Sequence, residues 1–257
     1  MIPEIVKEHA GRHHRTLRDA LQTFMQVVLL KNLRHETARL IGGTALVLGY
    51  ANPRFSEDLD LTSVADPLSL ERSLLTGSRE LEGWLSTKAT LSAPKKDSRT
   101  WKIAVAIAEF GNVHLHIDSQ PYPTYANTPL IADFPGFNPI VCNSVAVEEI
   151  MADKLVAIAL QNYLGGRDLF DLWFHWLRTE DRNARERQIR LMVPKKLRDR
   201  RVRARDWMEL FQKRLSAMNL QRARVEWKRY LPPDFSQPAI LEEIIQRVGK
   251  LPSLLLP

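Results

Sequence analysis

Two short runs of the sequence carry residue types that bind phosphate groups and the metal ions that accompany them. Gly42-Gly43-Thr44 opens a stretch of helical character, where free N–H groups and the positive end of the helix dipole attract phosphate oxygens. Asp58-Leu59-Asp60 alternates polar and apolar residues as a strand does, so its two carboxylates share one face. Carboxylates in this spacing suit divalent ions shared with a nucleoside triphosphate. Together the runs predict a nucleotide site.

Two neighbouring residues extend this candidate site toward the triphosphate. Ser56 lies two residues before Asp58 and shares its face if the strand has begun there, so its hydroxyl could bind a phosphate. Arg54 could add a positive charge beside Ser56, or could be a turn residue after Pro53.

A second predicted strand, residues 112–119, has a polar face of its own. Val113, Leu115 and Ile117 alternate with His114, His116 and Asp118, as expected for a strand with one buried side. Imidazole and carboxylate groups on one face can bind Zn²⁺, which gives an alternative interpretation of these three polar residues. That alternative leaves the glycine run and the pair of aspartates unexplained.

The elements that position these residues follow from the hydrophobic periodicity. Helices are predicted over residues 16–33, 45–50 and 68–85, and strands over 102–110 and 112–119 with a turn at Gly111-Asn112. Five prolines crowd residues 121–139, which predicts a long ordered loop there. We therefore place a domain boundary near Pro139, giving a core of residues 1–139 and a helical lobe of residues 140–257. Helices over 147–161 and 167–177 begin that lobe.

Composition excludes several classes of protein. The chain has 257 residues, of which 44% are hydrophobic and 26% charged, as in ordinary globular proteins. Its single cysteine, Cys142, has no second cysteine with which to form an internal disulfide, and the N-terminal residues are too polar for a signal peptide. No apolar run approaches the ~20 residues of a membrane helix. We expect a cytoplasmic protein that needs no membrane.

Positive charge is concentrated in one part of the sequence. The net charge is +7, but residues 178–229 alone contain 18 Lys and Arg against 7 Asp and Glu, a local charge of +11. Such a segment favours binding to a polyanion such as RNA, because each neutralised phosphate releases counterions. The alternative is a set of solvated helix faces.

Four segments of the chain resemble three motifs of a known family. Residues 41–46 (IGGTAL) and 54–61 (RFSEDLDL) are similar to the first motif of the AbiEii/AbiGii toxin family, a branch of the polymerase-β-like nucleotidyltransferases. Residues 148–155 (EEIMADKL) resemble its lysine motif, and residues 167–173 (RDLFDLW) its final acidic motif. The resemblance covers residues of about 40 to 177 in the same order.

The resemblance implies a fold and an activity. The fold would be α+β: a polymerase-β-like nucleotidyltransferase core, with a small mixed sheet flanked by helices, followed by an all-helical lobe. The activity would be that of an NTP-dependent nucleotidyltransferase toxin from a toxin–antitoxin or abortive-infection (phage defence) pair. Some members of the family block translation by adding nucleotides to the 3′ end of tRNA. The expected partners are therefore an NTP, an RNA such as tRNA, and an antitoxin protein.

The resemblance also assigns roles in the site. Asp58 and Asp60 would hold Mg²⁺, or Mn²⁺ in its place, and Asp118 would be the third carboxylate, as a metal ligand or a general base. Gly42, Gly43, Thr44 and Ser56 would hold phosphates, with Arg54 as a weaker candidate.

Lys154 lies on a largely apolar helix, so its ammonium should point into a cleft where a triphosphate can satisfy its charge. By the resemblance, Asp171 would act with Lys154, as a base or as the residue that orients the lysine. Asp168, three residues earlier, is the alternative acid or a helix cap.

An acceptor hydroxyl would then attack the α-phosphorus of the NTP, and pyrophosphate would leave. Two other classes of function stay open at this point. One is a nucleotidyltransferase that modifies a protein or a small molecule, and the other is a non-catalytic nucleic-acid-binding module.

Overall fold

The computed structural model describes residues 2–33, 38–63, 67–94, 98–162 and 164–251. The chain forms two compact units. The sheet unit consists of Met1–Ala51, Phe55–Tyr122 and Asn127–Val145, and the helical unit of Asn52–Arg54, Pro123–Ala126 and Ala146–Pro257.

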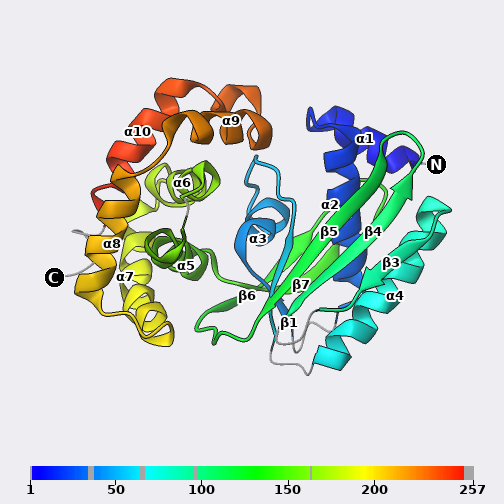
Figure 1. The fold of residues 1–257 in the computed structure, drawn as a ribbon, viewed down its shortest axis with the longest axis horizontal. Coiled ribbons are helices and arrows are strands. Elements are labelled where there is room, and N and C mark those ends of the chain that lie inside the picture. The colour runs from blue at the N-terminus through cyan, green and yellow to red at the C-terminus, as the bar shows by residue number, and fades with distance from the viewer. Residues whose placement is uncertain (1, 34–37, 64–66, 95–97, 163, 252–257) are drawn as a thin grey trace. The chain divides into compact units, whose positions relative to one another are not determined.

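A seven-stranded mixed sheet forms the framework of the sheet unit, with the strand order β3-β4-β5-β2-β1-β7-β6 (Figure 1). Strands β2 and β5 are parallel to each other, as are β1 and β7, and the other neighbours are antiparallel. The strands are β1 (Ala38–Leu40), β2 (Leu59–Ser63), β3 (Ala89–Ser92), β4 (Thr100–Ile107), β5 (Gly111–Gln120), β6 (Asn127–Ala132) and β7 (Ile140–Val145). The expected α+β class is confirmed.

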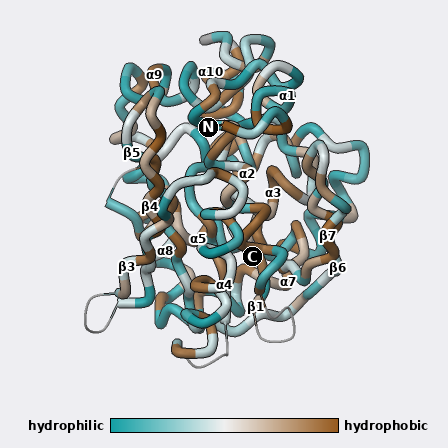
Figure 2. The backbone as a smooth tube through the Cα atoms, turned by 90° about the vertical axis from the view of Figure 1, so that its right-hand side faces the viewer, coloured by the Kyte–Doolittle hydropathy of each residue, from teal (hydrophilic) through white to brown (hydrophobic). Residues whose placement is uncertain are grey.

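Four helices pack around this sheet: α1 (Glu4–Arg12), α2 (Leu17–Lys31), α3 (Gly42–Gly49) and α4 (Pro67–Leu85). Helix α2 begins where the Thr16 side chain accepts a hydrogen bond from the Asp19 N–H, and its residues 27–30 are all buried. It packs against β5 and β7, while α3 packs against β2 and β6. In Figure 2 much of α3 is coloured as hydrophobic, in agreement with its buried position.

The predicted β-hairpin is present, but its turn differs by a few residues. β4 ends at Ile107, and the turn residues 108–110 connect it to Gly111, which pairs with Ile107. Gly111 has φ +74°, a conformation that glycine adopts without steric cost. Within β5, Val113, Leu115 and Ile117 are fully buried and alternate with His114, His116 and Asp118, as predicted.

In its described residues, the helical unit contains helices and connecting segments but no strand. The helices are α5 (Val147–Leu160), α6 (Gly166–Leu172), the π-helix η1 (Trp173–Leu177), α7 (Arg182–Asp199), α8 (Ala204–Ser216), α9 (Leu220–Tyr230), the short 3₁₀ helix η2 (Pro233–Phe235) and α10 (Pro238–Val248). Helix α5 is central to this unit, because α6, α7, α8 and η1 all pack against it. No helix among the described residues has the length and apolar character to cross a membrane.

The structure corrects the boundary that we expect near Pro139. Residues 140–145, which we place in the helical lobe, form β7 and belong to the sheet unit. The proline-rich stretch is not one long loop either, since it contains β6, with Pro129 inside the strand. β6 is an edge strand, where a missing backbone N–H is tolerated, so the prolines did not exclude a strand.

Candidate active site

Gly42 brings the start of α3 directly against Asp60. Its φ is +66°, and a Cβ atom at this position would lie only 2.5 Å from Oδ2 of Asp60. Any other residue would be strained by both the backbone conformation and this contact. The Ile41 N–H also donates to the Asp60 carbonyl at 3.0 Å. The glycine run is therefore needed to hold a helix N-terminus beside one of the two predicted metal ligands.

The segment that carries Asp58 is held by side chains of two helices. The Gln26 side chain, from α2, donates to the carbonyls of Ser56 (2.9 Å) and Asp58 (3.0 Å). The Thr44 hydroxyl, from α3, also donates to the Asp58 carbonyl. These bonds fix the backbone of Asp58, just before β2 begins at Leu59. The carboxylate of Asp58 is thus presented from a rigid support.

The hydrogen bonds of Thr44 and Ser56 support a different role from the one that the sequence predicts. The two hydroxyl oxygens lie 3.0 Å apart, and both side chains are buried. Because Thr44 donates its only hydroxyl hydrogen to the Asp58 carbonyl, Ser56 must donate its own to Thr44. Neither hydroxyl has a hydrogen left to give to a phosphate. The geometry therefore supports a positioning role for both residues rather than the expected phosphate contact.

Asp118 lies beside Asp60 in the sheet. The two residues are paired in the parallel register of β2 and β5, so their side chains leave the same face. On the other side, Thr100 of β4 pairs with Asp118 and donates its hydroxyl to Oδ1 of that carboxylate. Both aspartates are partly exposed. The sheet thus brings together two of the three carboxylates that we expect to bind metal.

Throughout the described ranges, no three His, Cys, Asp or Glu side chains form a ready-made metal site. This holds for the alternative zinc site of His114, His116 and Asp118, which share a face of β5, and equally for the three aspartates Asp58, Asp60 and Asp118.

Asp171, on α6 in the helical unit, lies at the centre of a buried cluster of charges. Its carboxylate is inaccessible to solvent and accepts two hydrogen bonds from Arg54, at 2.7 and 2.9 Å. Lys154 lies 2.8 Å from Oδ2, and Asn52 donates to Oδ1 at 2.7 Å. Burial opposes ionisation of Asp171, but Arg54 and Lys154 outweigh it and hold its pKa well below the usual range. Its two cationic neighbours thus hold Asp171 as an anion, which supports the orienting role over the role of a base.

Lys154 is held between two carboxylates. Its ammonium lies 2.7 Å from Oδ1 of Asp168 as well as 2.8 Å from Asp171, and its side chain is only 11% exposed. Burial alone would lower the pKa of Lys154, yet the two anions raise it above its ordinary value. Both acids that the sequence offered as alternatives therefore contact the lysine, and their geometry supports an orienting role.

Two residues of this cluster were not predicted. Asn52 donates to Asp171, accepts the Arg54 N–H at 3.1 Å, and contacts Nε2 of His175 at 3.1 Å. His175 is buried, and burial above all lowers its pKa to about 4, so it is neutral at pH 7. No sequence pattern marked either residue as part of the site; the only signal was the polar His175 within the apolar run from Leu172 to Leu177.

Arg54 has a more specific place than the sequence suggests. It is 4% exposed, and its guanidinium forms a bidentate ion pair with Asp171. The geometry therefore makes it a positioning residue for Asp171 rather than a turn residue, and gives no support to a direct contact with the nucleotide. In the chain, a single residue, Phe55, separates Arg54 from Ser56 of the sheet unit.

The two units divide the predicted site residues between them. The sheet unit contains the glycine run, Thr44, Ser56 and the three aspartates Asp58, Asp60 and Asp118. The helical unit contains Arg54, Lys154, Asp168 and Asp171. Within each unit, hydrogen bonds, ion pairs or strand register bring the predicted residues close to one another.

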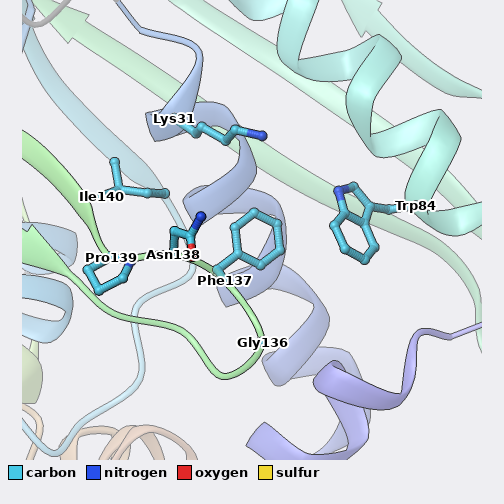
Figure 3. A pocket seen from close by; sticks show the side chains of 7 residues that line it. All are labelled: Lys31, Trp84, Gly136, Phe137, Asn138, Pro139 and Ile140. Carbon is cyan, nitrogen blue, oxygen red and sulfur yellow. The ribbon is translucent and has the colours of Figure 1, made fainter.

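A pocket elsewhere in the sheet unit contains none of these residues. It has a volume of about 430 Å³ and is lined by Lys31, Trp84 and residues 136–140 (Figure 3). Trp84 and Phe137 pack against each other with ring centroids 5.2 Å apart, and Lys31 pairs with Glu80 at 2.7 Å. The rings are too close to hold a flat ligand between them.

Comparisons with known structures agree with this fold. The chain is similar to MenT4, a nucleotidyltransferase toxin from Mycobacterium tuberculosis H37Rv, with 21% identity over 97% of this chain and 89% of that one and a TM-score of 0.66. A nucleotidyltransferase structure from Helicobacter pylori has 22% identity, coverage of 96% and 95%, and a TM-score of 0.55. JHP933, also from Helicobacter pylori, has 20% identity, coverage of 93% and 92%, and a TM-score of 0.51.

No curated protein sequence matches the chain. The family model described as nucleotidyl transferase AbiEii toxin, type IV toxin–antitoxin system, matches residues 23–247, which include every predicted site residue. Together with the glycine run against Asp60, the paired aspartates and the buried Lys154, this match shows that the chain belongs to the AbiEii family of nucleotidyltransferase toxins.

Proposed function

We propose that this toxin transfers a nucleotide from an NTP to the 3′ end of an RNA, with tRNA as the acceptor, and so blocks translation. The observation that carries the proposal is the arrangement around Asp60. This carboxylate lies against the N-terminus of α3 at Gly42 and is paired in register with Asp118. A helix N-terminus attracts phosphate, and neighbouring carboxylates attract the metal ions that accompany a triphosphate.

The donor set of the sheet unit fits Mg²⁺ or Mn²⁺. Asp58, Asp60 and Asp118 supply carboxylate oxygens, the hard ligands that these ions prefer. Gly42 lets the start of α3 lie directly against Asp60, because a Cβ atom there would be only 2.5 Å from Oδ2. When bound, such ions neutralise the triphosphate and stabilise the attacking and leaving oxygens of the transfer.

The chain's own residues bind and orient the triphosphate. The backbone N–H groups at the start of α3 point along the helix axis and bind phosphate oxygens. Lys154 uses two of its three N–H groups on Asp168 and Asp171, and the third binds a phosphate oxygen. Asp171, fixed by Arg54 and Asn52, orients that lysine. Catalysis then depends mainly on positioned charge.

In the reaction, the acceptor hydroxyl forms a bond to the α-phosphorus, the bond to the bridging β-phosphate oxygen breaks, and pyrophosphate leaves. We assign the acceptor side to Asp118, which is paired in register with Asp60, as a proton acceptor or a further metal ligand. In the cell, the product would be an RNA with a blocked 3′ end, and an antitoxin protein would prevent this damage. We place the activity in the cytoplasm and its use in phage defence.

A single experiment tests the proposal. The protein is incubated with total RNA, Mg²⁺ and each radiolabelled NTP in turn, and the products are separated by size. We expect one nucleotide to label RNA of tRNA length, and label to disappear when Mg²⁺ is chelated. Label on protein, or on no macromolecule, would overturn the choice of acceptor.

One observation favours a second acceptor class. Several cations of residues 178–229 are neutralised within the helical unit, such as Lys196 by Glu149 at 2.6 Å and Arg200 by Asp153 at 2.8 Å. The basic segment therefore presents less charge to RNA than the sequence suggests, which suits a protein or small-molecule acceptor. Acceptor binding with little salt dependence would support that alternative. Membership of a nucleotidyltransferase family argues against a non-catalytic binding module.

A further inference from the structure

One exposed arginine lies over three aromatic rings in the helical unit. The Arg178 guanidinium lies 5.4 Å from the ring centroid of Trp173, 5.6 Å from that of Phe174 and 5.4 Å from that of Phe235. The three rings are partly exposed, and Arg178 itself is exposed. We call these four residues the arginine–aromatic platform.

Arg178 has no carboxylate partner in the part of the chain that the structure describes, whereas several of its basic neighbours have one. Arg190, for example, pairs with Glu186 at 3.3 Å, and Arg203 pairs with Asp206 at 2.7 Å. The Arg178 guanidinium makes cation–π contacts with ring faces instead of an ion pair with a carboxylate. Its positive charge therefore remains available for an anionic ligand.

The platform is attached to the element that carries Asp171. Helix α6 continues directly into η1, so Trp173 follows Asp171 by two residues and Phe174 by three. Phe174, three residues after Asp171, shares its side of the helix, whereas Trp173 does not. The Phe174 ring lies 5.0 Å from that of His175, measured between ring centroids. The π-helical turn of η1 is a rare geometry that occurs often at functional sites. His175, in the same turn, contacts Asn52 of the Asp171 cluster.

We propose that the arginine–aromatic platform binds an unpaired base near the 3′ end of the RNA acceptor. This inference rests on the proposed function. The flat guanidinium, supported by three rings, offers a surface on which a base of any sequence can stack, and its charge attracts the adjoining phosphate. Aromatic rings and arginine planes bind single-stranded RNA in this way. The position beside the Asp171 cluster then places the 3′ end near Lys154.

The test compares variants of the full chain in binding a fluorescent RNA hairpin with an unpaired 3′ overhang. A second hairpin with a blunt 3′ end serves as the comparison ligand. We expect Arg178→Ala and Trp173→Ala each to weaken binding of the overhang RNA by about tenfold, and to change binding of the blunt RNA little. Arg178→Lys should remain weak, because lysine keeps the charge but lacks the plane. Arg190→Ala is the matched control, since it removes an exposed, ion-paired arginine of the same segment.

The outcomes separate this inference from the proposed function. If the parental protein binds neither RNA, the proposed RNA acceptor is wrong, and so is the proposed role of the platform. If the parental protein binds the overhang RNA and Arg178→Ala binds it equally well, the platform is wrong while the acceptor stands. Full recovery in Arg178→Lys would show that charge alone acts, and would also overturn the platform. NTP affinity without RNA, measured for every variant, should stay at the parental value and shows that each variant is folded.

Discussion

The two units hold their functional charges in different ways. In the sheet unit, the segment carrying Asp58 is fixed through its backbone, by Gln26 and Thr44 at the Asp58 carbonyl and by Ile41 at the Asp60 carbonyl. In the helical unit, the charges are fixed through each other, with Asp171 fully buried between Arg54 and Lys154. Hydrogen bonds to the backbone position a carboxylate without occupying its oxygens. In a buried ion pair, by contrast, each charge depends on its partner.

This difference predicts how each region responds to substitution. Removing the Asp58 carboxylate from the sheet unit should impair chemistry and leave the fold intact, because the bonds to the Asp58 carbonyl remain. Removing a member of the Asp171 cluster should impair both, because a buried charge then loses its partner.

The largest effect is expected for Asp171→Ala. The change leaves the buried guanidinium of Arg54 without its anion, and should lower the free energy of unfolding by about 3–5 kcal/mol. Urea unfolding followed by tryptophan fluorescence measures this, since Trp173, Trp176, Trp207 and Trp227 all lie in the helical unit. Parental stability in Asp171→Ala would contradict the idea of mutually dependent charges.

Asp58→Ala is the counterpart in the sheet unit. We expect nucleotide transfer to fall at least about a hundredfold, because a metal-binding carboxylate is lost. The unfolding free energy should change by less than about 0.5 kcal/mol, since the bonds to the Asp58 carbonyl remain. Transfer at the parental rate would show that Asp58 is not a metal ligand. Gln26→Leu is a useful second variant, because it removes the side-chain hydrogen bonds to the Ser56 and Asp58 carbonyls and leaves the Asp58 carboxylate in place.

A smaller effect concerns pH. Burial lowers the pKa of His175 to about 4, while in the unfolded chain it titrates near its usual 6.5. The unfolded state therefore takes up the proton first, and stability is lost as the pH falls from 6.5 toward 4. Between pH 7 and pH 5 we expect a loss of about 2 kcal/mol from this residue.

The variant His175→Gln, compared with the parent at both pH values, isolates this contribution. The variant His9→Gln is the counterpart in the sheet unit, because the pKa of His9 is also lowered to about 4, mainly by burial. If His175→Gln loses as much stability as the parent on acidification, His175 does not sense this pH change.

The smallest effect is expected for exposed arginines of residues 178–229. Arg187 and Arg205 are exposed and form no ion pair with any described residue, unlike Arg203, which pairs with Asp206. Replacing both by alanine should weaken RNA binding evenly across sequences. It should also flatten the log–log salt dependence by about 0.7 for each RNA phosphate that the variant no longer neutralises. Arg203→Ala should change the slope less. Equal slopes in the parent, the double variant and Arg203→Ala would show that Arg187 and Arg205 do not bind RNA.

Local patterns predicted part of the sheet unit, namely helices α2, α3 and α4 and strands β2, β4 and β5, but not α1, β1, β3 or β7. The glycine run did begin a helix, and the polar face of residues 114–118 did alternate with buried residues, because both depend on neighbours in the sequence. The strand β6 was missed, since prolines mark loops unless the strand lies at an edge. The role of Gln26 was also missed, although a glutamine within an apolar helix is the kind of signal that marks a buried polar contact.

The Asp171 cluster shows where sequence reasoning stops. Lys154 and both candidate acids were predicted, yet their mutual contacts, and those of Asn52 and Arg54, join residues up to 123 positions apart. No periodicity connects such positions. The same limit applies to Thr44 and Ser56, where only the three-dimensional hydrogen-bond pattern shows that the hydroxyl hydrogens are already used.

The most direct test of the central claim follows the fate of the two ends of the triphosphate. The protein is incubated with tRNA and Mg²⁺ and with the same NTP, labelled either at the α- or at the γ-phosphate, and Asp58→Ala serves as the inactive control. Nucleotidyl transfer predicts that α-label enters the RNA and γ-label is released as pyrophosphate, with neither event in Asp58→Ala. Entry of γ-label into the RNA, or release of γ-label as inorganic phosphate with no α-label in any product, would contradict the account.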